Sequence, residues 1–373
     1  MKIIFCGGGS AGHVTPALAI AEEIKKKDSS AQLLFIGREG GFENGMVKKA
    51  GLPMQYIKIG GLQRKFTVKN IKNAINAFKA VNKCKKIISD FSPDVVVGTG
   101  GYVCWPVLQA AASLKIPTVI HESNRAPGLT TRLLSKKCTT VLLNHKNTAD
   151  DLKRKDNVRV IGNPLRSDFN TIRKSEARRR LKIGKDDIYI VSFGGSIGAQ
   201  RMNDVILKIM KEEEKSANIK HLHATGKRYY ENKDTSDTKQ SNSKIVPYID
   251  DMPIHLCAAD IVICRSGAMT LSEIALTGAS AILIPSPNVS ENHQYKNAKA
   301  LADEGACIMI EECELTEKVL NDKISELVNS KEKRQELGKR IKKFATKNAS
   351  ALAAESIIKI TKNSGSASNF LAI

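Results

Sequence analysis

Apolar and polar positions alternate in blocks along nearly the whole chain. Short aliphatic runs are separated by segments whose apolar residues recur with helical spacing. Many of the runs are apolar at consecutive positions, which is typical of parallel strands covered by helices on both faces. The pattern predicts strands at residues 2–6, 31–36, 94–98, 117–121, 139–143 and 158–161, and then at 188–193, 220–224, 244–246, 260–264, 280–284 and 306–310.

The strands fall into two series, which predicts an α/β fold with two Rossmann-like, doubly wound parallel-sheet domains. Gly162-Asn163-Pro164 closes the first series, and the polar residues 166–187 precede the second. We therefore expect one domain at residues 1–163 and another at 164–345. The tail 363–373 begins Asn-Ser-Gly-Ser and is expected to be loose.

Composition restricts the class of protein. A hydrophobic fraction of 42% is typical of a globular protein. No segment reaches the roughly 20 apolar residues of a membrane-spanning helix, and the N-terminal pattern does not predict a secretory signal. The eight cysteines are scattered without a C-x-x-C pair, so we expect reduced thiols and no zinc site in a cytosolic protein.

The net charge of +21 predicts an anionic partner, which could be nucleic acid, a membrane surface or a phosphorylated substrate. Only 5% of residues are aromatic and no nucleic-acid-binding motif is present, so we expect no nucleic-acid partner. Residues 61–90 carry eight Lys or Arg around an apolar stripe of Ile71, Ile75 and Phe78. This basic amphipathic helix either lies on an anionic membrane or packs within a domain.

Three glycine-rich loops follow predicted strands: Gly7–Gly12, Gly98–Gly101 and Gly194–Gly198. Glycine allows sharp turns and lets backbone N–H groups approach an anion at a helix N-terminus. Neither the dinucleotide-binding fingerprint nor a Walker loop fits them. A fourth strand end leads into Arg265-Ser266-Gly267, where Ser266 is the predicted N-cap. The loops predict an enzyme that binds a phosphate-bearing nucleotide.

The motifs GGGSAGHVTPALAIA, GTGGY, HESN, GNPLR, GGSIGA, YIDDM, CRSGAMTLSE and HQYKNA together resemble the MurG family over about residues 2–310. The resemblance implies a GT-B architecture whose final helix, at about 346–362, returns to the first domain. It also implies transfer of N-acetylglucosamine (GlcNAc) from UDP-GlcNAc to lipid I, the undecaprenyl-pyrophosphoryl-MurNAc-pentapeptide. The enzyme would then be peripheral, at the cytoplasmic face of the cell membrane.

The resemblance also implies the substrate contacts. Ile249 would meet the uracil, Glu273 the ribose, and Ser196 with the helix start at residues 268–270 the diphosphate. The donor site would comprise Ser10, Ala11, Gly12, Asn124, Arg166, Ser196, Ile249, Ala268, Met269, Thr270, Leu271, Ser272, Glu273 and Gln294. The acceptor pyrophosphate would contact Gly9, Ser10, Gly100 and Gly101.

Inverting transfer to the muramyl 4-hydroxyl needs a base, and the candidates are His13 and Glu122. The sequence has no D-x-D motif, so we expect no metal ligands and no cofactor, with helix-terminal N–H groups and Arg166 stabilising the leaving diphosphate. Three other functions stay open: a UDP-GlcNAc epimerase, a diacylglycerol glycosyltransferase and a nucleic-acid-binding protein. His221 and His223 share a strand face without an evident third ligand, and Trp105 fits either a core or a cleft wall.

Overall fold

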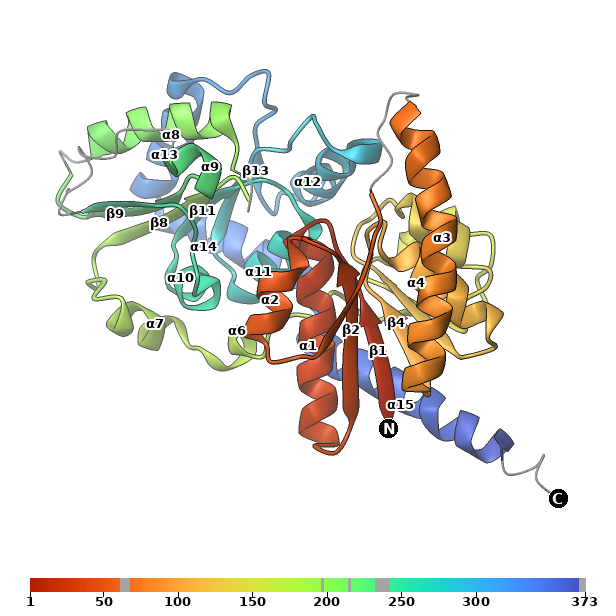
Figure 1. Cartoon of the computed structure of the whole chain (residues 1–373). Helices are drawn as coiled ribbons and strands as arrows, with labels where there is room; N and C mark the ends of the chain where they lie inside the picture. Colours follow the sequence, from red (N-terminus) through yellow and green to blue (C-terminus); the bar gives the residue numbers. More distant parts are fainter. Residues whose placement is uncertain (61–67, 196–197, 214–215, 232–241, 369–373) are drawn as a thin grey trace. The chain divides into compact units, whose positions relative to one another are not determined.

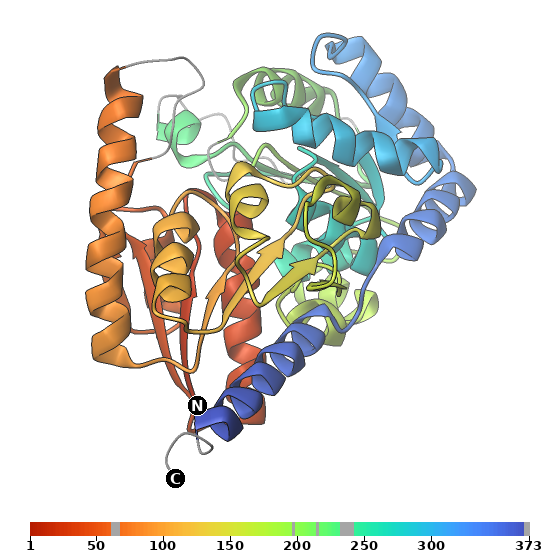
Figure 2. The same cartoon turned by 90° about the vertical axis from the view of Figure 1, so that its right-hand side faces the viewer.

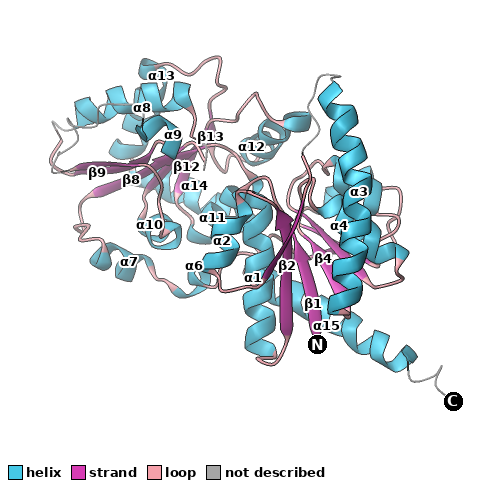
Figure 3. Cartoon of the chain, viewed as in Figure 1, coloured by secondary structure: helices cyan, strands magenta, loops and turns pink. Residues whose placement is uncertain are grey.

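The computed structural model describes residues 1–60, 68–195, 198–213, 216–231 and 242–368. It divides into two compact units, Met1–Arg166 with Asn348–Ile373, and Ser167–Lys347. The boundaries predicted from the sequence, 163/164 and 345/346, lie close to these. Strands and helices alternate through both units, as Figure 3 shows.

The described residues of the first unit form a seven-stranded parallel sheet in the order β3-β2-β1-β4-β5-β6-β7. Its strands are β1 (Lys2–Cys6), β2 (Gln32–Arg38), β3 (Met54–Ile57), β4 (Val95–Gly98), β5 (Thr118–Glu122), β6 (Thr140–Leu143) and β7 (Val158–Val160). The sequence pattern predicted all of these except β3. That strand forms one edge of the sheet and exposes Gln55 and Tyr56, so it lacks the continuous apolar run of the buried strands.

Helices cover both faces of this sheet. They are α1 (Ala11–Lys27), α2 (Glu43–Lys49), α3 (Val68–Phe91), α4 (Cys104–Ser113), α5 (Leu129–Leu134), the 3₁₀ helix η1 (Lys146–Asp151) and α15 (Ala349–Ser368). Ile3 and Phe5 of β1 pack with α1, α2 and α15, whereas Ile4 and Cys6 pack with α3, α4 and α5. Figures 1 and 2 both show α15 running alongside α1, so the end of the chain completes the core of the first unit.

Helix α15 corrects one expectation about the tail. Residues 363–368, predicted to be loose, continue the helix as far as Ser368. They include asparagine and glycine, which favour a helix weakly, but no proline, and they extend a helix that is anchored by Ala353, Ala354 and Ile357. Residues 369–373 lie outside the described part of the chain.

The second unit repeats the architecture with a six-stranded parallel sheet, in the order β10-β9-β8-β11-β12-β13 within the described residues. Its strands are β8 (Ile188–Phe193), β9 (Ile219–Ala224), β10 (Ser243–Val246), β11 (Ile261–Cys264), β12 (Ser280–Leu283) and β13 (Ile308–Met309). Its helices are α6 (Asp168–Thr171), α7 (Lys174–Arg180), α8 (Gln200–Glu213), α9 (Lys227–Glu231), α10 (Met252–Ala258), α11 (Ala268–Thr277), α12 (His293–Asp303), α13 (Glu317–Asn329) and α14 (Lys331–Ile341), with the 3₁₀ helices η2 (Ser290–Asn292) and η3 (Lys342–Phe344). The predicted pair of doubly wound α/β domains is confirmed.

Asp260 joins α7 to the start of β8. Its carboxylate accepts hydrogen bonds from Lys174 Nζ and Arg178 at 2.7 Å each, and from the Tyr189 amide at 2.9 Å. Burial raises the pKa of Asp260, but Lys174, the Tyr189 amide and Arg178 outweigh burial and hold the pKa below its usual value of 3.8. The carboxylate is therefore ionised in the folded protein near neutral pH.

We predict that Asp260→Asn destabilises the second unit by about 3 kcal/mol, because it leaves two cations near a neutral amide. Hydrogen–deuterium exchange of peptides covering β8 and β11 measures the free energy of opening. Asp303→Asn is the matched control, since it breaks an ion pair with Lys299 that is more than half exposed on both sides, and such pairs contribute about 0–1 kcal/mol.

The same carboxylate gives a pH dependence. Because the folded-state pKa is depressed, its stabilisation is complete above the unfolded pKa of about 3.9 and disappears as the pH falls through the lower folded-state pKa. The Asp260→Asn variant should lack this part of the acid destabilisation. Parallel acid-unfolding curves for the variant and the wild type would contradict the assignment.

Candidate active site

In the first unit, the strand order reverses between β1 and β4. Two predicted glycine-rich loops follow these two neighbouring strands, at residues 7–10 and 99–103. In open α/β sheets such a reversal leaves a crevice at the carboxyl ends of the strands, where ligands bind. The topology therefore places the predicted loops at Gly7–Gly12 and Gly98–Gly101 at a potential binding position.

The two loops touch backbone to backbone. A Cβ on Gly101 would lie 2.1 Å from the Gly8 carbonyl oxygen, and one on Gly7 would lie 2.6 Å from both His13 O and Thr99 Oγ1. Gly101 also has a φ of +83°, which L side chains rarely adopt. The Gly8 N–H donates to Gly100 O at 3.3 Å. These glycines are therefore required by contact as well as by conformation.

His13 lies in the first turn of α1, after the N-cap Ser10. Its Nδ1 is 3.0 Å from the Gly8 carbonyl oxygen and 3.2 Å from Ser10 Oγ. A carbonyl oxygen only accepts, so Nδ1 carries the proton and Nε2 carries the lone pair. Within the described part of the chain Nε2 has no hydrogen-bond partner, and this half-buried ring can accept a proton there.

Glu122, the other candidate base, is already engaged. Its carboxylate accepts hydrogen bonds from the Asn124 amide at 3.0 Å, Asn124 Nδ2 at 3.1 Å, the Gly128 amide at 2.9 Å and Thr131 Oγ1 at 2.7 Å. Burial lowers the pKa of the preceding His121 to about 4, so that neutral ring donates through Nε2 to Gly162 O. This arrangement fixes the loop after β5 and favours an organising role for Glu122.

The sequence did not identify Glu43 as a site residue. This fully buried carboxylate accepts from the Arg38 amide at 2.7 Å and the Gly9 amide at 3.4 Å. It thereby holds the loop that contains Gly9 and Ser10, next to Ala11 and Gly12 at the start of α1. No motif marks Glu43; only its place at the start of α2, one strand away, brings it to the loop.

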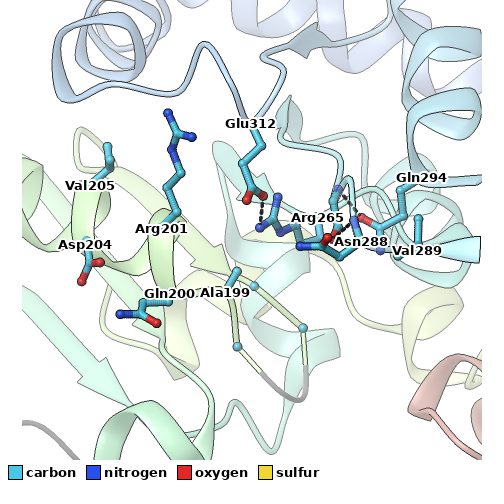
Figure 4. Close-up of a pocket in the computed structure, with 14 residues that line it drawn as sticks. Ala199, Gln200, Arg201, Asp204, Val205, Arg265, Asn288, Val289, Gln294 and Glu312 are labelled. Atoms are coloured by element: carbon cyan, nitrogen blue, oxygen red, sulfur yellow. Dashed lines mark hydrogen bonds and ion pairs between the residues drawn. The ribbon is translucent and has the colours of Figure 1, made fainter. Parts of the chain in front are cut away.

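The second unit has the same reversal, between β8 and β11. A cavity of about 880 Å³ opens at the carboxyl ends of these strands. Gly194, Gly195 and Gly198 of the predicted loop line it; Ser196, between them, lies outside the described residues. The other lining residues are Ala199, Gln200, Arg201, Asp204, Val205, Arg265, Ser286, Asn288, Val289, Gln294 and Glu312, most of which Figure 4 labels.

Arg265 braces one wall of this cavity. Its guanidinium forms an ion pair with Glu312 and donates to the carbonyls of Ile284 at 3.1 Å and Pro285 at 3.3 Å. Gln294 is fixed on the same side, since its Oε1 accepts from the Ser286 amide at 2.9 Å, which leaves its Nε2 as a donor. The sequence predicted Gln294 but not the Arg265–Glu312 pair, whose members lie on different loops.

Helix α11 begins one residue later than predicted. Gly267 occupies the N-cap position, and the buried Ser266 Oγ makes no hydrogen bond among the described residues. Ser266 therefore does not cap the helix, because an extended Gly267 separates the two. The predicted donor residues 268–273 form the first turns of α11, and Ile249 is buried with 3% of its surface exposed. None of these residues lines the cavity.

Arg166 is exposed and belongs to the first unit, beyond the predicted domain boundary. His221 and His223 are both buried and share one face of β9, as predicted. The described residues contain no group of three or more His, Cys, Asp or Glu side chains that could hold a metal ion. In the same part of the chain, every helix is too short or too polar to cross a membrane.

Comparison with known proteins places both units. The glycosyltransferase family 28 N-terminal domain matches residues 3–143, and its C-terminal domain matches residues 189–354. Two curated relatives are named UDP-N-acetylglucosamine--N-acetylmuramyl-(pentapeptide) pyrophosphoryl-undecaprenol N-acetylglucosamine transferase. The one from Acetivibrio thermocellus is 40% identical over 97% of this chain and 99% of its own length. The one from Halalkalibacterium halodurans is 41% identical over 86% and 89%.

Solved structures agree on the fold. Acinetobacter baumannii MurG has a TM-score of 0.74 at 27% identity, covering 96% of this chain and 99% of its own. The UDP-GlcNAc 2-epimerase from Neisseria meningitidis, solved bound to UDP-GlcNAc, has a TM-score of 0.67 at 13% identity, with 96% and 100% coverage, and supports the fold alone. The architecture is thus the predicted GT-B fold. This chain belongs to glycosyltransferase family 28 and, within that family, to the MurG transferases.

Proposed function

We infer that this chain is a UDP-GlcNAc-dependent N-acetylglucosaminyltransferase that converts lipid I to lipid II in peptidoglycan synthesis. The observation that carries the inference is 40% identity, over 97% of the chain, to a transferase with that name. The glycine-rich loops at the carboxyl ends of the strands in both units support the inference, because ligands of such folds bind there and backbone N–H groups of such loops would approach a phosphate.

We propose that the donor binds the second unit. The loop at Gly194–Gly198, with Ser196, would take the diphosphate, together with the N–H groups of Ala268, Met269 and Thr270 at the start of α11. Ile249 would contact the uracil, and Glu273, with Leu271 and Ser272 beside it, the ribose diol. Gln294 Nε2, held in place by the Ser286 amide, would donate to the sugar.

The acceptor pyrophosphate would bind the first unit at Gly9, Ser10, Gly100 and Gly101, where the loop conformation is set by the glycine contacts. Ser10, Ala11, Gly12, Asn124 and Arg166 would complete the donor site from this side. The proposal needs no metal and no cofactor, because helix-terminal N–H groups and Arg166 would stabilise the leaving UDP.

We propose that His13 Nε2 removes the proton of the muramyl 4-hydroxyl while that oxygen attacks C1 of GlcNAc and UDP departs from the opposite face. The Gly8 carbonyl keeps the proton on Nδ1 and therefore leaves the lone pair on Nε2. Glu122, with its four donors, would instead hold the loop that carries Asn124.

We also propose that the enzyme docks on the cytoplasmic face of the membrane through the α3–α5 face of the first unit. Phe78 is 67% exposed and stacks edge-to-face on Trp105, with ring centroids 5.5 Å apart. Leu129 and Leu133 of α5 are 61% and 54% exposed. Exposed lysines on α3 would attract anionic headgroups. Residues 61–67 and the side chains of Ile71 and Ile75 lie outside this description.

For the proposed activity, we predict that product forms from radiolabelled UDP-GlcNAc and a lipid I analogue, and that EDTA does not lower its yield. The control reactions contain diacylglycerol or no acceptor. Transfer to diacylglycerol would identify the other transferase class, and loss of UDP-GlcNAc without an acceptor would identify an epimerase. DNA binding without donor affinity would overturn the proposed function altogether.

Another prediction distinguishes between the two candidate bases. His13→Gln should lower kcat by about 10²–10⁴-fold with little change in the KM for UDP-GlcNAc, because general-base catalysis contributes that much. Glu122→Gln should instead lower the thermal midpoint, since one oxygen that accepts hydrogen bonds becomes a donor. A folded, equally stable Glu122→Gln enzyme with the larger loss of kcat would reverse the assignment.

A further prediction concerns binding to an anionic membrane. The affinity for phosphatidylglycerol vesicles, measured by sedimentation, should fall at least about thirtyfold for Phe78→Asp with Lys79→Glu and Lys83→Glu, since each basic residue near such a surface contributes about 1 kcal/mol. The matched control reverses two exposed lysines of the second unit, Lys185 and Lys331. Equal retention of both variants on the vesicles would instead favour a packing role for α3.

A further inference from the structure

Four polar side chains form a continuous chain of hydrogen bonds in the core beneath α8. Glu213 Oε2 lies 2.6 Å from His221 Nδ1, and His221 Nε2 lies 2.7 Å from Ser192 Oγ. Ser192 Oγ lies in turn 2.8 Å from His223 Nδ1. At most 7% of any of these residues is exposed. The chain of hydrogen bonds runs from Glu213, the last residue of α8, through Ser192 of β8 to His223 of β9.

The chemistry of the two ends fixes the direction of every proton. The Glu213 carboxylate only accepts, so the His221 proton lies on Nδ1 and its Nε2 accepts from the Ser192 hydroxyl. His223 Nδ1 also lies 3.2 Å from the Ser192 carbonyl oxygen, which only accepts, so this nitrogen is a donor. With Nδ1 of each ring as the donor, each group donates toward Glu213 in one consistent arrangement.

The fold itself does not require these polar groups. The same face of the sheet is otherwise an apolar cluster with Ile188, Ile190, Met202 and Ile206. Buried hydroxyls and imidazoles are unfavourable there unless every partner is in place. Nor does the cluster fit a catalytic triad, despite its carboxylate, imidazole and hydroxyl, because Ser192 is completely inaccessible to a substrate.

The chain of hydrogen bonds ends directly under the loop that lines the cavity. Ser192 is two residues before Gly194, and its carbonyl is tied to His223. Two residues after His223, the carbonyl of Thr225 accepts from Asn203 Nδ2 at 2.9 Å. A Cβ on Gly198 would lie 2.1 Å from the same carbonyl oxygen. The end of β9 thus contacts the cavity-lining loop directly.

We propose that Ser192, His221, His223 and Glu213 are positioning residues for this loop. By locking the ends of β8 and β9 together, they hold the Gly198–Thr225 contact and so position the backbone of Gly194, Gly195 and Gly198 for a diphosphate. The proposal rests on the proposed donor site. It assigns no chemical step to the buried groups, which act only through the loop.

The test is Ser192→Ala, which removes the central hydroxyl and leaves both imidazoles without it. We expect the KM for UDP-GlcNAc and the calorimetric Kd for UDP each to rise about tenfold, because the loss of the buried hydrogen bonds shifts the loop. The kcat at saturating donor should change less than about threefold. His223→Asn breaks the same link by another route. The same rise in KM is expected, which keeps the test valid if Ser192→Ala does not fold.

Tyr189→Phe is the matched control. It removes a hydroxyl from the same strand, and this hydroxyl also contacts a histidine, at 2.7 Å from His255 Nδ1. Neither residue lines the cavity. Its thermal midpoint should fall while the KM for UDP-GlcNAc stays unchanged. Equal KM values for the wild type, Ser192→Ala and His223→Asn would overturn the positioning role. A wild-type chain that does not bind UDP would instead overturn the proposed donor site.

Discussion

The structure depends on backbone-to-backbone contact between loops that follow neighbouring strands, β1 and β4 in the first unit and β8 and β9 in the second. In the first unit Gly101 packs on the Gly8 carbonyl, and in the second Gly198 packs on the Thr225 carbonyl; in both cases a Cβ would lie only 2.1 Å from the oxygen. Such contacts exclude side chains from the places where a phosphate must approach the backbone. The same glycines thus determine both the packing of the loops and their potential to bind an anion.

The parallel sheets make these contacts possible. Because β1 and β4, and likewise β8 and β9, are adjacent and parallel, the loops that follow each pair leave from the same edge. Buried polar groups then fix the loops from beneath: Glu43 and Thr99 in the first unit, and Asn203 in the second. These supports belong to neighbouring elements, so a loop can be rigid although its own sequence is mostly glycine.

The difference between features set by consecutive residues and features set by distant partners explains how much could be predicted from the sequence. Features that depend on consecutive residues were found: twelve strands, the glycine-rich loops and the two histidines on one face of β9. Features that depend on partners distant in sequence were not found, such as Glu43 under Gly9 or Glu312 on Arg265. Strand β3 was missed because an exposed edge lacks the apolar run, and Ser266 was assigned as a cap because Gly267 carries no side-chain signal.

The two units also hold their glycine-rich loops in place with different side chains. In the first, His13 lies in the first turn of α1 and its imidazole binds the Gly8 carbonyl, so one ring both shapes the loop and presents a nitrogen with a lone pair. In the second, the imidazoles are buried beneath the loop and touch only Ser192 and Glu213 among the contacts described for them. A histidine that must exchange a proton needs an accessible nitrogen, whereas one that only holds a backbone in place is better buried, where water does not compete for its hydrogen bonds. The same residue type is therefore suited to chemistry in one unit and to positioning in the other.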